Sequence, residues 1–132
     1  MTTDNIDPEE VDKFEAIARR WWDPTSEFKP LHDINPLRLA YISERTNLRG
    51  KRVLDVGCGG GLLTEALCRA EAEDTGIDAG AAPIAVAKLH QFESGCDIQY
   101  MQLTVEALAK EEPEPFDIIT LSLIHISEPT RL

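Results

Sequence analysis

Apolar and polar residues follow a helical period in the first third of the chain. From Val11 to Trp22 apolar residues recur every three or four positions, and charged residues fill the opposite face. This period predicts an amphipathic helix, with Asp7 as its N-cap and a proline in the next position. The stretch from Asp23 to Asp33 contains two prolines and is interpreted as an irregular connection. Asn35-Pro36 then predicts the start of a second helix that ends near Arg45.

From Lys51 onward, short apolar runs alternate with helical patterns. The predicted strands are Arg52 to Gly57, Asp74 to Asp78, Ile98 to Leu103 and Asp117 to Leu121, and the predicted helices are Gly60 to Ala70, Ala81 to Ser94 and Val105 to Lys110. This alternation predicts an α/β fold with a parallel sheet and right-handed crossovers. We expect the two N-terminal helices to cover the carboxyl edge of that sheet, where ligands bind.

A glycine-rich turn follows the first predicted strand. The sequence there is Val53-Leu54-Asp55-Val56-Gly57-Cys58-Gly59-Gly60-Gly61. Glycines let the backbone approach a ligand closely, and the N–H groups that open the following helix then face that ligand. A dinucleotide fingerprint requires G-x-G-x-x-G, but the sixth position counted from Gly57 is Leu62. The pattern is D-x-G-x-G-x-G instead, and the alternative that the glycines only form a tight turn stays open.

An acidic residue ends the second predicted strand. Asp78 follows Gly57 by about one strand-helix-strand repeat, which places its carboxylate beside the glycine turn. A carboxylate only accepts hydrogen bonds and therefore suits a pair of ribose hydroxyls. Alternatively, Asp78 caps the helix that begins near Ala81. Thr104-Val105-Glu106 follows the third strand at the same edge, where it could contact an adenine, although Glu106 could equally cap a short helix.

Length, composition and charge indicate how many domains the chain forms and which kinds of molecule it can bind. The 132 residues correspond to one domain, and 42% of them are hydrophobic, which is enough for a packed core. With 13 basic against 24 acidic side chains the formal charge is −11, which argues against nucleic acid and favours a small-molecule substrate. No apolar run is long enough to span a bilayer, and the first residues are unlike a signal peptide, so we expect a cytoplasmic protein.

Several further residues have two interpretations. The three cysteines lack metal-ligand spacing, and Cys58 has no base placed beside it by the motif, so it is not expected to be a nucleophile. His90 lies on the polar side of its predicted helix and is interpreted as a surface residue. Trp21 and Trp22 belong either to the core or to a cover over the ligand site. Arg38, in the first turn of the second predicted helix, is by itself interpreted as a surface arginine.

The motifs together resemble those of the class I S-adenosylmethionine-dependent methyltransferases, in which D-x-G-x-G-x-G is the first motif. From about Val11 to Thr120 the chain resembles the N-terminal half of the ubiquinone-biosynthesis O-methyltransferase family. The more selective segments, in the family's order, are Lys13-Phe14-Glu15, Trp21-Trp22-Asp23, Glu27-Phe28-Lys29-Pro30-Leu31-His32 and Ile34-Asn35-Pro36-Leu37-Arg38.

The resemblance implies a partial Rossmann-like class I methyltransferase fold whose C-terminal half is missing. It implies methyl transfer from S-adenosylmethionine to a phenolic hydroxyl of a polyprenylated ring in ubiquinone assembly. Arg38, Gly57 and Asp78 match cofactor-binding positions of the family, with the Arg38 guanidinium pairing with the methionine carboxylate. Ser122 falls where the family can place a further cofactor contact, and no catalytic residue is assigned. The full-length family also implies contact with the inner membrane or with a ubiquinone-biosynthesis complex.

The family carries Glu-x-x-Glu-His, associated with a divalent metal, after the fourth strand. This sequence lacks that motif, and its tail from about Leu121, including His125 and Glu128, resembles a translated sequencing adapter, so no metal ligand is assigned. The expected organisation is a helical cover over residues 1–50, a cofactor-binding half over 51–120 and a non-native tail over 121–132. Two alternatives stay open: an inactive fragment or weak cofactor-binding module, and a nicotinamide-dependent oxidoreductase, which Leu62 disfavours.

Overall fold

The computed structural model describes residues 8–122, which form five helices and four strands. In chain order these are α1 (Pro8–Trp22), α2 (Lys29–Arg45), β1 (Arg52–Val56), α3 (Leu62–Arg69), β2 (Glu73–Asp78), α4 (Ala81–Ser94), β3 (Gln99–Gln102), α5 (Val105–Lys110) and β4 (Ile118–Leu121). The bounds of α4 and α5 are those that the sequence predicts, and the strands differ from prediction by a residue or two at their ends. The predicted cap Asp7 lies outside the described residues.

The four strands form one parallel sheet in the order β3-β2-β1-β4, which confirms the α/β prediction. β1 lies in the interior, where Val53 pairs with Asp74 of β2 on one side and with Ile118 of β4 on the other. Because the strands are parallel, their carboxyl ends meet at one edge. The glycine turn after β1 and Asp78 at the end of β2 are therefore neighbours.

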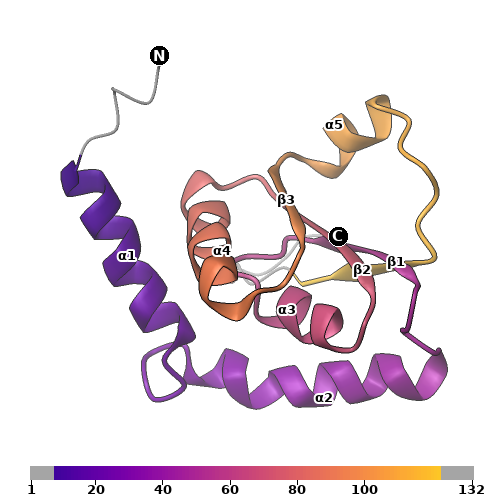
Figure 1. Ribbon diagram of the computed structural model, residues 1–132, viewed down its shortest axis with the longest axis horizontal. Helices are drawn as coiled ribbons and strands as arrows, with labels where there is room; N and C mark the ends of the chain where they lie inside the picture. Colours follow the sequence, from indigo (N-terminus) through magenta and orange to yellow (C-terminus); the bar gives the residue numbers. More distant parts are fainter. Residues whose placement is uncertain (1–7, 123–132) are drawn as a thin grey trace, which may run out of the picture.

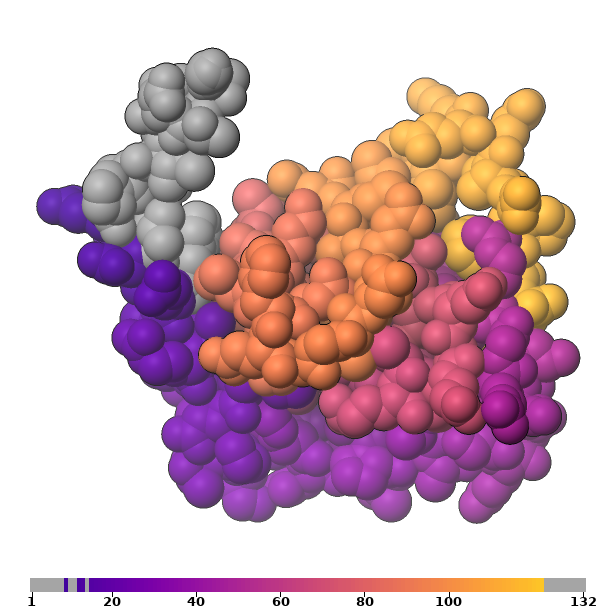
Figure 2. Space-filling view, in the orientation of Figure 1, coloured from indigo at the N-terminus to yellow at the C-terminus, as the bar shows by residue number. Residues whose placement is uncertain are grey.

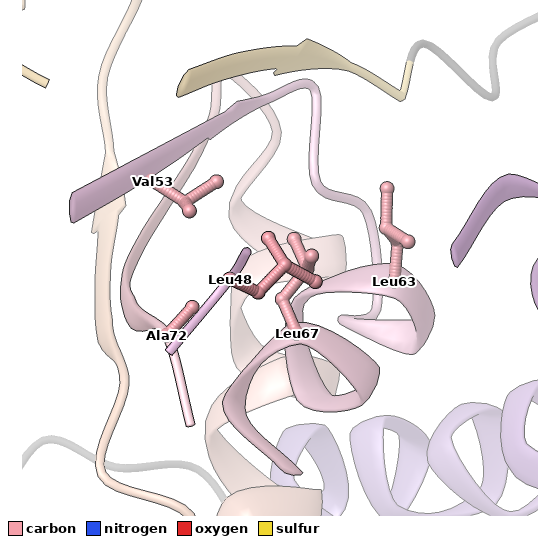
Figure 3. Close-up of a cluster of buried hydrophobic side chains, with 5 residues drawn as sticks. All are labelled: Leu48, Val53, Leu63, Leu67 and Ala72. Carbon is pink, nitrogen blue, oxygen red and sulfur yellow. The ribbon is translucent and has the colours of Figure 1, made fainter. Parts of the chain in front are cut away.

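Both faces of the sheet are covered, which explains why β1 is apolar on both sides. Val53 packs with Leu48, Leu63, Leu67 and Ala72 beneath α3 (Figure 3). The next residue, Leu54, points to the opposite face and packs with Ile77 and with Leu108 of α5. Helices α3 and α4 thus lie on one face of the sheet and α5 on the other (Figure 1).

The position of the two N-terminal helices differs from the prediction. α1 packs along α4 and α2 along α3, so both form an outer layer on the helices rather than a lid across the carboxyl edge (Figure 1). In the space-filling view α2 is a continuous band beneath α3 (Figure 2). Individual residues of this outer layer still reach the edge: Trp21 at the end of α1 and Arg38 in α2.

The predicted irregular connection is also too long. α2 begins at Lys29, not at Asn35, and Arg38 consequently lies well inside the helix instead of in its first turn. Pro30 occupies the first turn, where a proline costs little because that N–H has no helical partner. Pro36 lies inside the helix, a position that propensity disfavours and that packing of α2 on α3 overrides.

Candidate functional site

A cavity of about 500 Å³ opens at the carboxyl ends of β1, β2 and β3. Its wall is mostly apolar, and its one ionisable lining residue is Asp78. The full lining is Trp21, Val56, Gly57, Gly59, Ile77, Asp78, Ala79, Pro83, Leu103, Thr104 and Val105. The cavity therefore unites Gly57, Asp78 and the segment after β3, as the sequence predicts, in the volume range of small-molecule sites.

Asp78 connects the two loops that border this cavity. Its Oδ2 accepts a hydrogen bond from the Gly59 N–H at 3.0 Å and its Oδ1 accepts one from the Gly80 N–H at 2.8 Å. The N-cap of α4 is Gly80, without a side-chain cap, so the alternative that Asp78 caps this helix is wrong. Each carboxylate oxygen can accept more than one hydrogen bond, so both remain able to accept from a ligand hydroxyl.

The glycine turn is shaped by two aromatic side chains. A Cβ on Gly60 would overlap the pyrrole edge of Trp21, and a Cβ on Gly61 would lie 2.5 Å from the Tyr100 hydroxyl. Gly61 also has a φ of 94°, which side chains with a Cβ rarely adopt. The glycines therefore do more than form a tight turn: they let Trp21 and Tyr100 close against the backbone.

Trp21 and Trp22 have separate roles. Trp21 is 8% exposed, packs against Phe28 at a ring separation of 4.7 Å and borders the cavity. Trp22 does not line the cavity and stacks on His90, with ring centroids 3.5 Å apart and planes 5° from parallel. Both of the sequence's interpretations of these tryptophans thus apply to Trp21, which is core and cavity wall at once.

The prediction of a surface His90 holds only in part, because its side chain is 22% exposed and contacts a buried residue. Its Nδ1 lies 2.7 Å from Oε2 of Glu65, a residue of α3 with no exposed surface. Trp22 covers the histidine ring from α1. The sequence analysis interpreted His90 as solvated because it is a polar residue in a helical pattern. It overlooked Glu65, a second polar residue on the buried face of the neighbouring helix.

Arg38 and Ser122, predicted from the resemblance, meet at the end of β4. Arg38 Nη2 donates to Ser122 Oγ at 2.6 Å and lies 3.4 Å from the Leu121 carbonyl. Ser122 Oγ in turn donates to Asp55 Oδ1 at 2.5 Å. Arg38 lines a second groove, of about 660 Å³ between α2 and β4, and not the cavity that holds Gly57 and Asp78. The four predicted residues therefore form two pairs: Gly57 and Asp78 border the cavity, and Arg38 and Ser122 meet at the end of β4.

Asp55 joins these elements and was not singled out from the sequence as a site residue. The carboxylate, which has no exposed surface, also accepts hydrogen bonds from Thr64 Oγ1 at 3.0 Å and Thr120 Oγ1 at 2.7 Å. Burial raises the pKa of Asp55, and the three hydroxyl donors and the charge of Arg38 act in the opposite direction. Its signal in the sequence was an acidic residue inside an otherwise apolar strand.

Two further polar side chains, Cys58 and Thr104, lie at the carboxyl edge of the sheet. Burial, with the negative charges of Asp55 and Asp78, raises the pKa of the Cys58 thiol, which disfavours the reactive thiolate. Thr104, not Glu106, caps α5, accepting from the Ala107 N–H at 3.1 Å. Among the described residues there is no cluster of three or more acidic, histidine or cysteine side chains suited to a metal. Within the same residues, no helix is long and apolar enough to cross a membrane.

Comparison with known proteins defines the class. The family model described as a methyltransferase domain matches residues 53–132, and the chain belongs to this family. The fold agrees with that of a magnesium protoporphyrin IX methyltransferase from Synechocystis with bound SAM, with a TM-score of 0.67 at 21% identity over 83% of this chain and 55% of that one. A 16S rRNA methyltransferase from T. thermophilus, in complex with AdoMet and guanosine, gives a TM-score of 0.63 at 30% identity over 71% of this chain and 26% of that one.

Curated relatives point to one branch of methyltransferases. Proteins named ubiquinone biosynthesis O-methyltransferase from Pseudomonas entomophila and Pseudomonas fluorescens are each 60% identical to this chain over 128 residues. The match covers 96% of this chain and 55% of each relative. The chain thus spans about half the length of the curated relatives that it matches.

Proposed function

We propose that the cavity at the ends of β1, β2 and β3 binds S-adenosylmethionine. The observation that carries this proposal is Asp78, whose carboxylate borders the cavity while holding the N–H groups of Gly59 and Gly80. A carboxylate so placed suits the two ribose hydroxyls. The apolar walls beyond it, including Leu103 and Val105, suit the flat face of an adenine.

Arg38 lines the neighbouring groove at the end of β4, not the cavity itself, and we propose that it reaches the methionine end of the donor from there. Its guanidinium is held by Ser122, which is itself held by the buried carboxylate of Asp55. A planar guanidinium fits the carboxylate of the methionine moiety. The hydrogen bond to Ser122 already restricts the conformations of Arg38 before the ligand binds, so less side-chain entropy is lost on binding. In this proposal Ser122 acts by orienting Arg38.

The chemistry proposed for the whole protein is O-methylation of a phenolic ubiquinone precursor. Bound S-adenosylmethionine supplies an activated methyl group. The described residues bind this donor at the sheet edge and limit its motion, which contributes to rate by aligning the two reactants. The substrate class rests on the relatives' names and on the segment resemblance. We further propose a cytoplasmic protein that meets its polyprenylated substrate at the inner membrane or in a biosynthetic complex.

Isothermal titration of this chain with S-adenosylhomocysteine tests the cofactor site. We expect binding by the unmodified chain and at least a tenfold weaker affinity for Asp78→Asn, because charge-assisted hydrogen bonds to the ribose are lost. Asp97→Asn, at an exposed position outside the cavity, is the matched control. Equal affinities in all three proteins would remove Asp78 from the site.

Two alternatives are separated by further measurements. Stabilisation by NAD and not by S-adenosylmethionine in a thermal shift experiment would favour an oxidoreductase. Transfer activity is tested on a polypeptide of the relatives' full length, with S-adenosylmethionine and a catechol-type ubiquinone precursor, by detecting the O-methylated product. Turnover by the 132-residue chain itself would contradict the alternative that it is only a cofactor-binding module.

A further inference from the structure

One aromatic side chain borders the proposed donor cavity, and it comes from outside the methyltransferase core. Trp21 is the last residue but one of α1, yet it lines the cavity together with Gly57 and Gly59. Its pyrrole edge lies against Gly60 and its ring packs against Phe28. The side chain also packs with Leu62 and Val86 and is 8% exposed.

The order of the strands places Trp21 at a defined end of the cavity. Asp78 ends β2, and Thr104 and Val105 follow β3, whereas the glycine turn that Trp21 contacts follows β1. A ligand with its ribose at Asp78 and its adenine toward β3 extends its remaining part toward β1. In S-adenosylmethionine that part contains the sulfonium.

The cavity has no anionic side chain at this end. Asp78 is the one ionisable lining residue, and Asp55 beneath the turn is buried and already accepts three hydroxyl hydrogen bonds. The face of an indole carries negative quadrupole charge and attracts cations, and among side chains tryptophan does so best. The ring is thus the group available to a positive charge at the β1 end.

We propose that the ring of Trp21 contacts the sulfonium of the methyl donor and makes the site prefer the cationic donor over its neutral product. This inference rests on the proposed cofactor site. The product, S-adenosylhomocysteine, differs by the methyl group and the positive charge, so Trp21 determines specificity between two ligands that share every other contact. Weaker retention of the product favours its release after transfer.

The next residue of α1, Trp22, makes its contacts away from the cavity. The neighbouring Trp22 stacks on His90, which is hydrogen-bonded to the buried Glu65, and this ties the end of α1 to α3 and α4. Trp22 does not border the cavity. It therefore provides a control residue of the same type, one position away in sequence and outside the proposed contact.

The test is the ratio of two dissociation constants, that of S-adenosylhomocysteine divided by that of S-adenosylmethionine, measured by isothermal titration of the 132-residue chain. A ratio cancels any change that affects both ligands equally, such as altered packing. The attraction of the sulfonium by the net negative charge is the same in every variant, because the substitutions leave the charge of −11 unchanged. We expect Trp21→Leu to lower the ratio about five- to tenfold and Trp21→Phe to lower it less, since phenylalanine retains a weaker aromatic face. Trp22→Leu is expected to change the ratio less than twofold.

Each outcome decides the inference. An unchanged ratio in Trp21→Phe and Trp21→Leu, with both ligands still bound, overturns it, as does an equal fall in Trp22→Leu. If Trp21→Leu shows no cooperative thermal transition, the ratio in Trp21→Phe decides alone. Failure of the unmodified chain to bind either ligand would refute the cofactor proposal and the inference with it, whereas binding with an unchanged ratio refutes the inference alone.

Discussion

Asp74 gives the sharpest prediction about stability. This residue of β2 is 6% exposed, and neither of its carboxylate oxygens has a hydrogen-bond partner among the described residues. It pairs in register with Val53 and so faces the apolar layer beneath α3. Burial, and to a lesser degree the charge of Asp55, raises the pKa of Asp74 to about 8.

The sign of the effect follows from linkage. An aspartate in an unfolded chain has a pKa of about 3.9, so between that value and about 8 the folded protein binds the proton more tightly than the unfolded chain does. The contribution of Asp74 is fully present below pH 4 and is lost as the pH rises toward 8. Because one pKa unit corresponds to about 1.4 kcal/mol, a difference of about four units corresponds to a loss of at most about 6 kcal/mol, a large part of the stability of a small domain.

Urea denaturation of Asp74→Asn from pH 4 to pH 9 measures this loss. Asparagine keeps the shape without the charge, so we expect a variant near the parent in free energy of unfolding at pH 4 and several kcal/mol more stable at pH 8. Asp97→Asn, at an exposed position, serves as the control and should follow the parent. A parent-to-Asp74→Asn difference that stays constant across this range would refute the reasoning.

Three other predictions concern packing and reactivity. Gly60→Ala is expected to destabilise the chain by about 1–3 kcal/mol in thermal or urea denaturation, because its Cβ overlaps Trp21; a neutral effect would mean that the ring moves freely. Glu65→Gln is expected to cost about 1–3 kcal/mol, since it weakens the buried hydrogen bond to His90, and loss of the tryptophan near-ultraviolet dichroism would report the released stack. Cys58 should resist an aromatic disulfide reagent at pH 8 until the chain unfolds, because burial raises its thiol pKa. Cys58→Ala should bind S-adenosylhomocysteine as the parent does. Because Cys68 and Cys96 are also free, peptide mapping must locate the label, and rapid labelling of Cys58 itself would contradict the prediction.

The sheet and its connections were predictable because their signals are local. An apolar run before a glycine turn, and helical periods between the runs, fix where the chain alternates, and α4 and α5 begin and end as expected. The start of α2 was missed because Asn35-Pro36 resembles a helix N-terminus and Pro30 was assigned to the irregular connection, while packing against α3 keeps Pro36 inside the helix.

Of the candidate site, only the two residues at the ends of β1 and β2 could be placed from the sequence. Gly57 and Asp78 follow from spacing, since parallel strands bring their ends together. The role of Asp55 and the contact of Trp21 with Gly60 depend on side chains that are distant in sequence, and no periodicity reports them. His90 was misjudged for the same reason, because its partner Glu65 lies on another helix.

The hydrogen bond between Arg38 and Ser122 bears on how the site assembles. These residues are 84 positions apart, so the arginine leaves the ribosome well before its partner does. Until β4 docks beside β1, Asp55 lacks the hydroxyls of Thr120 and Ser122, and Arg38 has no anchor. Closing so long a loop is entropically costly and slow. In the proposed donor site, Arg38 is therefore held in place only after β4 has docked beside β1.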